Sequence, residues 1–313
     1  MRDHGGNIEA AKARFGGATW IDLSTGINRE AYPVAVSAES FAALPRKSAH
    51  EALIQAARQA YGTQAPLVVL AGAQGAIQMV PGVMAPGLAR VVSPTYNEHA
   101  ACLGAQGWRV EPVATLEALA GADIGVVVNP NNPDGRMWSR DQVLALRGKV
   151  GLLVVDESFA DPVPQVSVAD QAGPGLMVLR SFGKFYGLAG MRLGFALGEE
   201  TLVARMAELA GPWPVSGPAL EVGARALLDR AWAEATTARL GAEALRLDAL
   251  AAAWGWSLVG GTHLFRTYET GDARAAQEFL ARHGIWSRIF PWSKGWLRLG
   301  LPGLTEWSHL ETL

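Results

Sequence analysis

The 313-residue sequence contains a single cysteine, Cys102, so no disulfide can form within the chain. Scarce cysteine fits a reducing compartment, and we expect the protein to be cytoplasmic. No apolar run approaches the roughly 18 residues that a membrane span needs. Residues 1–10 carry charges and glycines where a secretory signal peptide has an apolar core. We therefore expect neither a disulfide-stabilised secreted domain nor a membrane protein.

An excess of charge of one sign is also missing. The chain has 27 Lys and Arg against 29 Asp and Glu, a formal net charge of −2. This balance gives no electrostatic footprint for nucleic acid or for an anionic membrane. Half of the residues are hydrophobic, enough to fill a sizeable core. The length suggests two domains, or one large α/β domain with an appended lobe.

Short, almost continuously apolar runs recur through the first two thirds of the chain. They are Leu67–Leu70, Arg90–Val92, Ile124–Val128, Leu152–Val155, Leu176–Leu179 and Leu193–Leu197. Runs without polar alternation are typical of parallel strands that are covered on both faces. Helical patterns between several runs, such as Arg140–Leu146, fit right-handed crossovers. The sequence therefore predicts an α/β fold around a mostly parallel sheet.

Polar side chains follow the ends of these predicted strands. The five are His99, Asn132, Asp156, Ser181 and Lys184. Ligands of open parallel sheets bind beyond the carboxyl ends of the strands, so we expect these side chains to converge on one crevice. The strand, glycine turn and helix start around Ala71–Gly75 add backbone N–H groups suited to an anion, although many such turns bind nothing.

The most informative stretch is Ser181–Phe195, which reads SFGKFYGLAGMRLGF. Its four glycines rule out a regular helix, and it places Lys184 in a turn with Arg192 eight residues later. A flexible amine can form an imine with a carbonyl cofactor, and a neighbouring arginine can hold a phosphate on that cofactor. The alternative is a surface loop in which both cations are solvated.

This stretch resembles the lysine motif of the fold-type I aminotransferases, S-x-[ST]-K-x-[FY]-G-[LM]-[AP]-G-x-R-x-G, and the match over its whole length argues against a solvated loop. The resemblance implies pyridoxal 5′-phosphate (PLP) as the cofactor. It also implies a large domain with a mostly parallel seven-stranded sheet, a small α+β domain, and a homodimer with the crevice at the subunit interface.

The resemblance further implies a role for each strand-end residue. Lys184 binds PLP, Asp156 keeps the pyridine nitrogen protonated, Asn132 bonds the ring oxygen, and His99 occupies the position of the ring-stacking aromatic. The phosphate is held by Ser181, Arg192 and the backbone amides of Gly72, Ala73 and Gln74. The residues alone also allow a helix cap or turn for Asp156, an ordinary Asn-Pro turn for Asn132, and a helix-face histidine for His99. No metal is assigned.

Four further segments resemble the threonine-phosphate decarboxylases of cobalamin biosynthesis, which are relatives of histidinol-phosphate aminotransferase. They are His4–Ile8 (HGGNI), Leu23–Asn28 (LSTGIN), Pro212–Val215 (PWPV) and Arg288–Arg298 (RIFPWSKGWLR). The resemblance implies decarboxylation of L-threonine O-3-phosphate to (R)-1-amino-2-propanol O-2-phosphate. Arg298 then binds the substrate carboxylate, Arg288 binds a second anionic group, and His4 and Asn28 contact substrate from an N-terminal arm. The alternative for that segment is a loosely ordered arm.

Four positions depart from the family pattern. Gly183 stands where many relatives have Ser or Thr for the phosphate, and Phe159 where transaminases often have a Tyr. Leu44-Pro45 replaces an R-Y-P, and Pro302 replaces an arginine of some decarboxylases. Two alternatives stay open. One is an aminotransferase of a phosphorylated substrate that uses the same residues, and the other is a catalytically idle PLP-binding scaffold.

We predict a domain boundary in Gly211–Pro218, where three prolines and two glycines interrupt the helical pattern. Residues 1–45 form an N-terminal arm and part of the small domain, residues 46–211 a large PLP-binding domain, and residues 212–313 the C-terminal small domain. Ala219–Trp254 is long enough for one helix or for two successive ones.

Overall fold

The computed structural model describes residues 4–17 and 19–313, and its chain forms two compact units. Unit 1 contains the N-terminal segment up to Ala31, Pro133–Gly135 and Glu234–Leu313. Unit 2 contains Tyr32–Asn132 and Arg136–Ala233. The two units therefore divide inside helix α10 (Arg230–Ala253), beyond the proline-rich segment at which we predicted a boundary.

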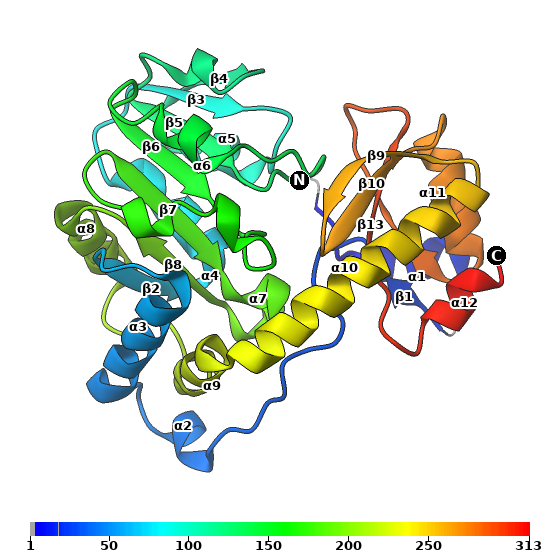
Figure 1. Cartoon of the computed structure of the whole chain (residues 1–313), viewed down its shortest axis with the longest axis horizontal. Coiled ribbons are helices and arrows are strands. Elements are labelled where there is room, and N and C mark those ends of the chain that lie inside the picture. Colours follow the sequence, from blue (N-terminus) through cyan, green and yellow to red (C-terminus); the bar gives the residue numbers. More distant parts are fainter. Residues whose placement is uncertain (1–3, 18) are drawn as a thin grey trace. The chain divides into compact units, whose positions relative to one another are not determined.

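The core of unit 2 is a seven-stranded sheet in the order β2-β8-β7-β6-β5-β3-β4 (Figure 1). The strands are β2 (Leu67–Ala71), β3 (Leu88–Val92), β4 (Arg109–Val113), β5 (Ile124–Val128), β6 (Leu152–Asp156), β7 (Leu176–Ser181) and β8 (Leu193–Leu197). Neighbouring strands from β7 to β4 pair in parallel, whereas β8 is antiparallel to both β7 and β2. The predicted mostly parallel α/β sheet is confirmed.

Helices cover this sheet. They are α3 (Lys47–Tyr61), α4 (Gly72–Met79), α5 (Glu98–Ala105), α6 (Arg140–Leu144), α7 (Phe182–Phe185), α8 (Glu200–Ala210) and α9 (Gly217–Leu228). The short helix α2 (Ala38–Ala42) buries no residue and lies beside α9 (Figure 1). One buried cluster joins Val154 and Met177 of the sheet to Ile77 of α4, Leu103 of α5 and Met206 of α8. This packing between the sheet and the helices fixes the positions of the parallel strands and of the residues at their carboxyl ends.

The proline-rich segment connects α8 to α9, and both helices belong to unit 2. Helix α9 belongs there because it packs closely against the large sheet and α3. A methyl group added at Gly223 of α9 would lie 2.5 Å from Leu193 Cδ2 and 3.0 Å from Leu53 Cδ1. Both leucines are fully buried. The prolines thus interrupt the helix without ending the packed unit.

We expect Gly223→Ala to be less stable than Gly104→Ala by about 1–3 kcal/mol, the usual cost of overpacking a core. Both glycines lie in helices, Gly223 in the middle of α9 and Gly104 in the last turn of α5, so both substitutions gain some helix propensity. A methyl group at Gly104 would meet no atom within 4 Å, which makes this variant the control. Urea unfolding at equilibrium measures the difference, and equal stabilities would contradict the packing argument.

Unit 1 contains two small sheets. In the first, β1 (Ile21–Asp22) pairs in parallel with β11 (Ile285–Trp286). The second is antiparallel in the order β12-β13-β10-β9, formed by β9 (Ser257–Thr262), β10 (Phe265–Glu269), β12 (Arg288–Ile289) and β13 (Trp296–Gly300). The other helices are α1 (Ile8–Phe15), α11 (Ala273–Arg282) and α12 (Trp307–Glu311). This is the predicted small α+β part.

The long alanine-rich stretch forms two helices, α9 and α10. Asp229 ends α9, and its side-chain Oδ1 accepts a hydrogen bond from the backbone N–H of Trp232 at 3.0 Å. An aspartate that caps a following helix allows the chain to stop one helix and begin another within two residues. Of the two possibilities that the sequence left open, two successive helices is the one observed.

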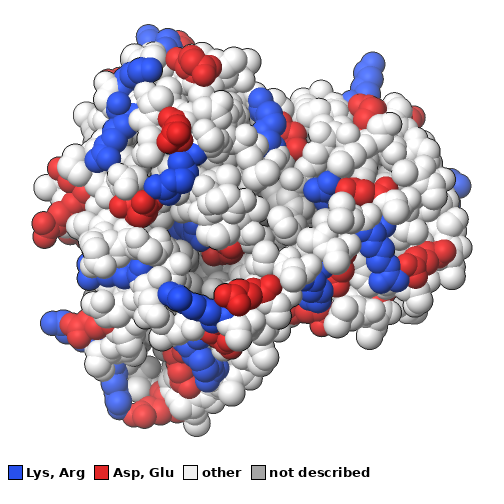
Figure 2. Space-filling model, viewed as in Figure 1, with Lys and Arg blue, Asp and Glu red and all other residues white. Residues whose placement is uncertain are grey.

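Acidic and basic side chains are mixed on the face of the molecule shown in Figure 2. Several form exposed ion pairs, such as Arg205 and Glu208 at 3.1 Å. Such pairs contribute about 0–1 kcal/mol each, so they matter more for solubility than for stability. Across residues 4–17 and 19–313, no helix is long and apolar enough to cross a membrane.

Candidate functional site

The predicted strand-end residues lie together at one edge of the unit 2 sheet. Asp156 is the last residue of β6, paired with Val128 of β5 on one side and Leu179 of β7 on the other. The backbone N–H of Asn129, just beyond β5, donates to the Asp156 carbonyl at 2.9 Å. Parallel pairing therefore brings the ends of three strands side by side, as the sequence predicted.

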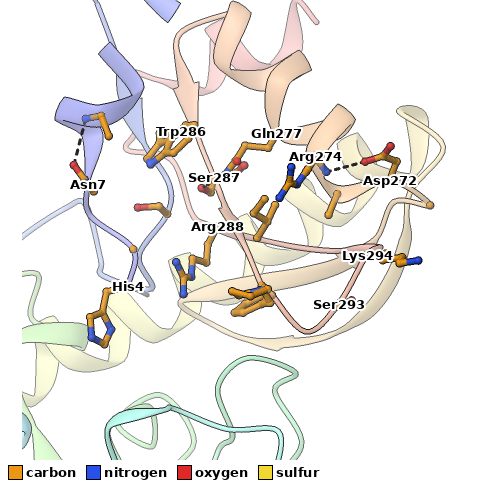
Figure 3. Close-up of a pocket in the computed structure, with 18 residues that line it drawn as sticks. His4, Asn7, Asp272, Arg274, Gln277, Trp286, Ser287, Arg288, Ser293 and Lys294 are labelled. Atoms are coloured by element: carbon orange, nitrogen blue, oxygen red, sulfur yellow. Dashed lines mark hydrogen bonds between the residues drawn. The ribbon is translucent and has the colours of Figure 1, made fainter. Parts of the chain in front are cut away.

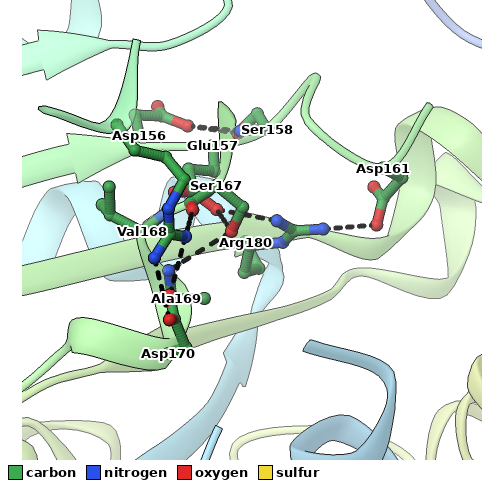
Figure 4. Close-up of polar contacts among 10 residues, drawn as sticks. Asp156, Glu157, Ser158, Asp161, Ser167, Val168, Ala169, Asp170 and Arg180 are labelled. Carbon is green, nitrogen blue, oxygen red and sulfur yellow. Dashed lines mark hydrogen bonds and ion pairs between the residues drawn. The ribbon is translucent and has the colours of Figure 1, made fainter. Parts of the chain in front are cut away.

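The Asp156 carboxylate is almost fully buried and held by several donors. His99 Nε2 lies 2.8 Å from Oδ2. The Ser158 backbone N–H and hydroxyl donate to Oδ1 at 2.9 and 2.5 Å, and Figure 4 shows Ser158 beside this carboxylate. Burial by itself raises the pKa of Asp156, but the bonds from His99 and Ser158 outweigh it and hold this pKa below its ordinary value. Asp156 is therefore a buried anion at neutral pH.

This lowered pKa determines how the free energy of unfolding changes with pH. A carboxylate whose pKa is depressed by folding stabilises the protein above its unfolded-state pKa of about 3.9, and the contribution disappears as the pH falls through the folded-state value. We expect wild type to exceed Asp156→Asn in free energy of unfolding at about pH 5, and by less below about pH 4. Urea unfolding between about pH 5 and 3 tests it. A difference that grows as the pH falls through this range would contradict it.

His99 is the second residue of α5 and is buried rather than on an exposed helix face. Its ring makes an edge-on contact with the Tyr96 ring, with centroids 6.3 Å apart. Its contact with Asp156 was not predicted from the sequence, which assigned the ring only a stacking role. Stacking on a cofactor stays a prediction.

Lys184 lies in α7, directly after β7, and is half-buried. Its Nζ is 5.7 Å from the ring centroid of Phe159, the residue that replaces a family tyrosine. Ser181 is the last residue of β7 and pairs with Gly194 of β8. The lysine and the serine are therefore both at the edge of the sheet where Asp156 lies.

The structure explains why Gly183 replaces the Ser or Thr of many relatives. A Cβ atom at this position would lie 2.6 Å from Ala189 Cα and 3.1 Å from Ala189 N. Backbone atoms cannot move aside as the end of a flexible side chain can. The hydroxyl that relatives place here is therefore incompatible with this path of the glycine-rich turn.

Gly72 and Arg192 lie close together at the start of α4, in an arrangement that could hold an anion. Gly72 has φ +75° at the start of α4, and an added Cβ would lie 2.8 Å from Arg192 Nη2. Arg192 has φ +51°, and its Nη1 donates to the Ala189 carbonyl at 3.0 Å. No side chain caps α4, so the N–H groups of its first turn and a guanidinium are available to the same anion.

The side chain of Gln74 is hydrogen-bonded to Tyr96 and Glu98, two residues that were not predicted from the sequence. Its Oε1 accepts from the Tyr96 hydroxyl at 3.1 Å, and its Nε2 donates to Glu98 Oε2 at 3.1 Å. Burial raises the pKa of Tyr96 to about 12, so the hydroxyl stays protonated. The anion contact that we predicted for Gln74 uses its backbone N–H and stays a prediction. The run of polar residues around His99 in PTYNEH was the available signal.

Asn132 is half-buried in the turn after β5. The asparagines before it stabilise that turn. Asn129 exchanges two hydrogen bonds with the Trp138 backbone at 3.0 and 3.1 Å, and Asn131 Nδ2 donates to the Pro94 carbonyl at 2.9 Å. Asn129 and Asn131 thus stabilise this turn, and the ring-oxygen role of Asn132 stays a prediction.

The predicted substrate residues all belong to unit 1. His4 and Arg288 line a pocket of about 690 Å³, which is formed by the N-terminal segment, α11 and the segment around β12 (Figure 3). Arg288 is directly opposite Arg298 in the β12–β13 pair. Arg298 is buried and donates to the Ser24 carbonyl at 2.8 Å. Three arginine and histidine side chains are thus gathered in this unit.

Asn28 is also buried. Its Oδ1 accepts from Arg239 Nη2 at 2.8 Å and from the Glu30 backbone N–H at 3.1 Å. The neighbouring β1 pairs with β11, and Ser24 is fully buried. The segment after β1 is therefore packed in place, which excludes a loosely ordered arm for Leu23–Asn28.

The unit 2 site has the components that PLP requires. A buried carboxylate can keep a heterocyclic nitrogen protonated, a half-buried lysine follows the neighbouring strand, and a helix start with a guanidinium suits a phosphate. The approach of Arg192 to Gly72 is the most specific observation, because a side chain at residue 72 would fill the space beside the guanidinium. The residues present therefore fit this cofactor.

Comparisons with known proteins agree with this interpretation. The family profile described as aminotransferase class I and II matches residues 18–308. The chain is 41% identical over 323 residues to a threonine-phosphate decarboxylase of Pseudomonas aeruginosa, covering 99% of this chain and 96% of that protein. It is 42% identical over 313 residues to one of Sinorhizobium sp., covering 95% and 92%.

Among solved structures, the chain is similar to a histidinol-phosphate aminotransferase from Sinorhizobium meliloti in complex with pyridoxal-5′-phosphate. The TM-score is 0.86, with 21% identity over 97% of this chain and 92% of that chain. At this identity the likeness concerns the fold. The fold is that of the fold-type I PLP-dependent enzymes, as predicted.

Proposed function

Because the chain belongs to the class I and II aminotransferase family, we propose that it uses PLP to decarboxylate L-threonine O-3-phosphate to (R)-1-amino-2-propanol O-2-phosphate. The observation that carries this proposal is the relationship to two threonine-phosphate decarboxylases along nearly the whole chain. The product is the precursor of the linker in the corrin nucleotide loop, so the proposal places the chain in cobalamin biosynthesis.

When bound, PLP supplies an electron sink that stabilises the negative charge left on the substrate α-carbon. In the proposal, the ε-amine of Lys184 would hold the cofactor and would donate the proton that replaces the carboxyl group on the substrate α-carbon. Asp156 pairs with the pyridine nitrogen and keeps it protonated. Its lowered pKa supports this role, since the carboxylate stays charged at neutral pH.

The other cofactor contacts come from the same edge of the sheet. Arg192, Ser181 and the backbone N–H groups of residues 72–74 hold the phosphate, supported by the closeness of Gly72 and Arg192. Asn132 bonds the ring oxygen. His99 takes the ring-stacking position, from which its Nε2 also reaches Asp156 in this structure. Because Gly183 lacks the hydroxyl group that many relatives have at this position, Arg192 makes a larger share of the contacts to the phosphate.

Unit 1 supplies the proposed substrate contacts. Arg298 binds the substrate carboxylate, Arg288 a second anionic group, and His4 and Asn28 contribute further contacts. The support is local to this unit, because Arg288 and Arg298 are cross-strand partners and His4 lines the pocket that Arg288 also lines. Guanidinium groups suit both carboxylate and phosphate through paired N–H donors.

Product analysis tests the proposed reaction. With PLP and L-threonine O-3-phosphate, we expect carbon dioxide and aminopropanol phosphate in equal amounts without any amino acceptor. A strict requirement for a 2-oxo acid would instead assign an aminotransferase of a phosphorylated substrate, the activity that the family profile also favours. Bound PLP without turnover on any amine would assign an idle scaffold.

We also propose a cytoplasmic homodimer that acts on a small phosphorylated amino acid, with no nucleic-acid or membrane partner. Three large apolar side chains of unit 2 support the dimer: Phe41, Leu44 and Trp213 are 71%, 65% and 56% exposed. Leu44 lies where relatives carry the tyrosine of R-Y-P that reaches the partner subunit. Sedimentation should give about twice the chain mass of 33.1 kDa, and a monomer at micromolar concentration would contradict the dimer.

A further inference from the structure

A buried cluster of charges lies directly behind the cofactor site in unit 2. Its centre is Arg180 of β7, one residue before Ser181 and four before Lys184. The side chain is 5% exposed, so its guanidinium must find partners within the protein. The mechanism proposed above does not use this residue.

Two carboxylates pair with this guanidinium (Figure 4). Arg180 Nη1 donates to Glu157 Oε2 at 2.7 Å, and Nη2 donates to Asp161 Oδ1 at 2.6 Å. The guanidinium carbon also lies 4.3 Å from the centroid of the Tyr61 ring of α3. The contacts therefore join β7 to the segment that follows β6.

Glu157 extends these connections. Its Oε1 accepts from the Val168 backbone N–H at 2.6 Å, and its Oε2 accepts from the Ser167 hydroxyl at 2.5 Å. Its own backbone N–H donates to the Leu179 carbonyl of β7 at 2.9 Å. The three contacts to its carboxylate and the backbone bond together fix Glu157, which directly follows Asp156.

The paired carboxylates enclose the residues that face the cofactor site. Ser158 and Phe159 lie between Glu157 and Asp161 in the sequence. Ser158 donates two hydrogen bonds to the Asp156 carboxylate. The centroid of the Phe159 ring lies 5.7 Å from Lys184 Nζ. A shift of either anchored end would move both side chains.

We propose that Arg180 is a positioning residue for the cofactor, which fixes Asp156, Phe159 and Lys184 relative to one another by joining Glu157 and Asp161 to β7. The inference rests on the proposed function, because it assumes that PLP binds at Lys184 and Asp156. Arg180 itself touches neither cofactor nor substrate in this assignment.

The arrangement of charge favours positioning over a gain in stability. One guanidinium faces two carboxylates, and Asp161 Oδ2 and Arg180 Nε have no hydrogen-bond partner in the described part of the chain. Burial raises the pKa of Glu157 and of Asp161, with Arg180 acting against it. Buried ion pairs are often no more stable than apolar replacements of similar volume. What this cluster supplies is a fixed two-pronged geometry.

Three variants test the proposal. Arg180→Lys keeps the charge but loses the two-pronged geometry. The triple variant Arg180→Met, Glu157→Gln, Asp161→Asn removes all three charges together, so no buried charge is left without its partner. Arg140→Met is the matched control, because Arg140 forms another two-pronged pair, with Asp170 at 2.8 Å, and contacts the same loop at Ser167.

Titration of the full-length chain with PLP, followed by absorbance, gives the dissociation constant and the pH midpoint of the bound cofactor. We expect Arg180→Lys and the triple variant to bind PLP about 10- to 100-fold more weakly, the range seen when partners that orient a ligating side chain are lost. We also expect both to shift the midpoint, whereas Arg140→Met matches wild type in both.

A purely structural role predicts another outcome. Urea unfolding would then show lower stability, while the PLP dissociation constant and the pH midpoint stayed at their wild-type values, and this would overturn the proposal. If Arg180→Lys does not fold, the triple variant decides alone. Failure of the proposed function is recognised separately, because a wild-type chain that binds no PLP or releases no carbon dioxide shows it before any variant is compared.

Discussion

Replacing Lys184 with alanine is expected to lower the rate of carbon dioxide release by about 10⁴-fold or more. The ε-amine has two tasks in the proposed reaction, to bind the cofactor and to return a proton to the α-carbon. Proton transfer by a positioned side chain alone contributes about 10²–10⁴-fold. No second lysine lies in Ser181–Phe195, so no neighbouring amine in this stretch can replace that of Lys184.

The measurement is carbon dioxide release from L-threonine O-3-phosphate at saturating PLP. Lys149→Ala is the control, because Lys149 is exposed and precedes β6, whereas Asp156 lies at the other end of that strand. This control should retain the wild-type rate. A Lys184→Ala enzyme within about tenfold of wild type would remove Lys184 from the reaction and with it the proposed assignment of the site.

Asp156→Asn is expected to weaken PLP binding, carbon dioxide release or both by about 10²–10⁴-fold in total. The substitution keeps the shape of the side chain but removes the charge that pairs with the pyridine nitrogen. Breaking a buried ion pair costs about 3–5 kcal/mol, and each 1.36 kcal/mol corresponds to tenfold. Because His99 and Ser158 hold this carboxylate in its charged form, the loss should be large at neutral pH.

The dissociation constant of PLP measures the effect on binding. The rate of carbon dioxide release at saturating PLP measures the effect on the reaction. Asp170→Asn serves as the control, because Asp170 is likewise a hydrogen-bonded carboxylate, paired with Arg140, but is exposed. An Asp156→Asn variant with wild-type affinity and rate would show that the carboxylate serves the fold alone. The pH series proposed above would then still report its pKa.

The apolar runs predicted most of the unit 2 strands well. β5 and β8 begin and end at the predicted residues, because their side chains are buried on both faces and leave no polar alternation. β4 was missed for the opposite reason. It is an edge strand whose residues, such as Arg109 and Glu111, are partly or largely exposed, so it carries no apolar run. The short helix α2 buries no residue and was missed as well.

Tertiary contacts account for what local patterns could not predict in the site. The family pattern marked Gly183 as a departure, but only the approach of the Ala189 backbone shows why a hydroxyl cannot stand there. His99 was placed by its position after β3, whereas its bond to Asp156 depends on how α5 packs on the sheet. The Arg180 cluster joins residues 157, 161 and 180, a spacing with no local signal.

The resemblance to the decarboxylases added what neither patterns nor geometry contain. A carboxylate, a lysine and an anion cradle at strand ends would serve many reactions on PLP, because the bond that breaks depends on the pose of the substrate. The four segments from His4 to Arg298 pointed to one substrate, and the relationship along the whole chain supports it.

The central claim is that the ε-amine of Lys184 carries the cofactor, and chemical labelling tests it most directly. The chain is purified with PLP, reduced with borohydride and digested, and the peptides are weighed by mass spectrometry. The account predicts one pyridoxyl label, on the peptide that contains Lys184. A label on another of the chain's lysines, or on none, would contradict it.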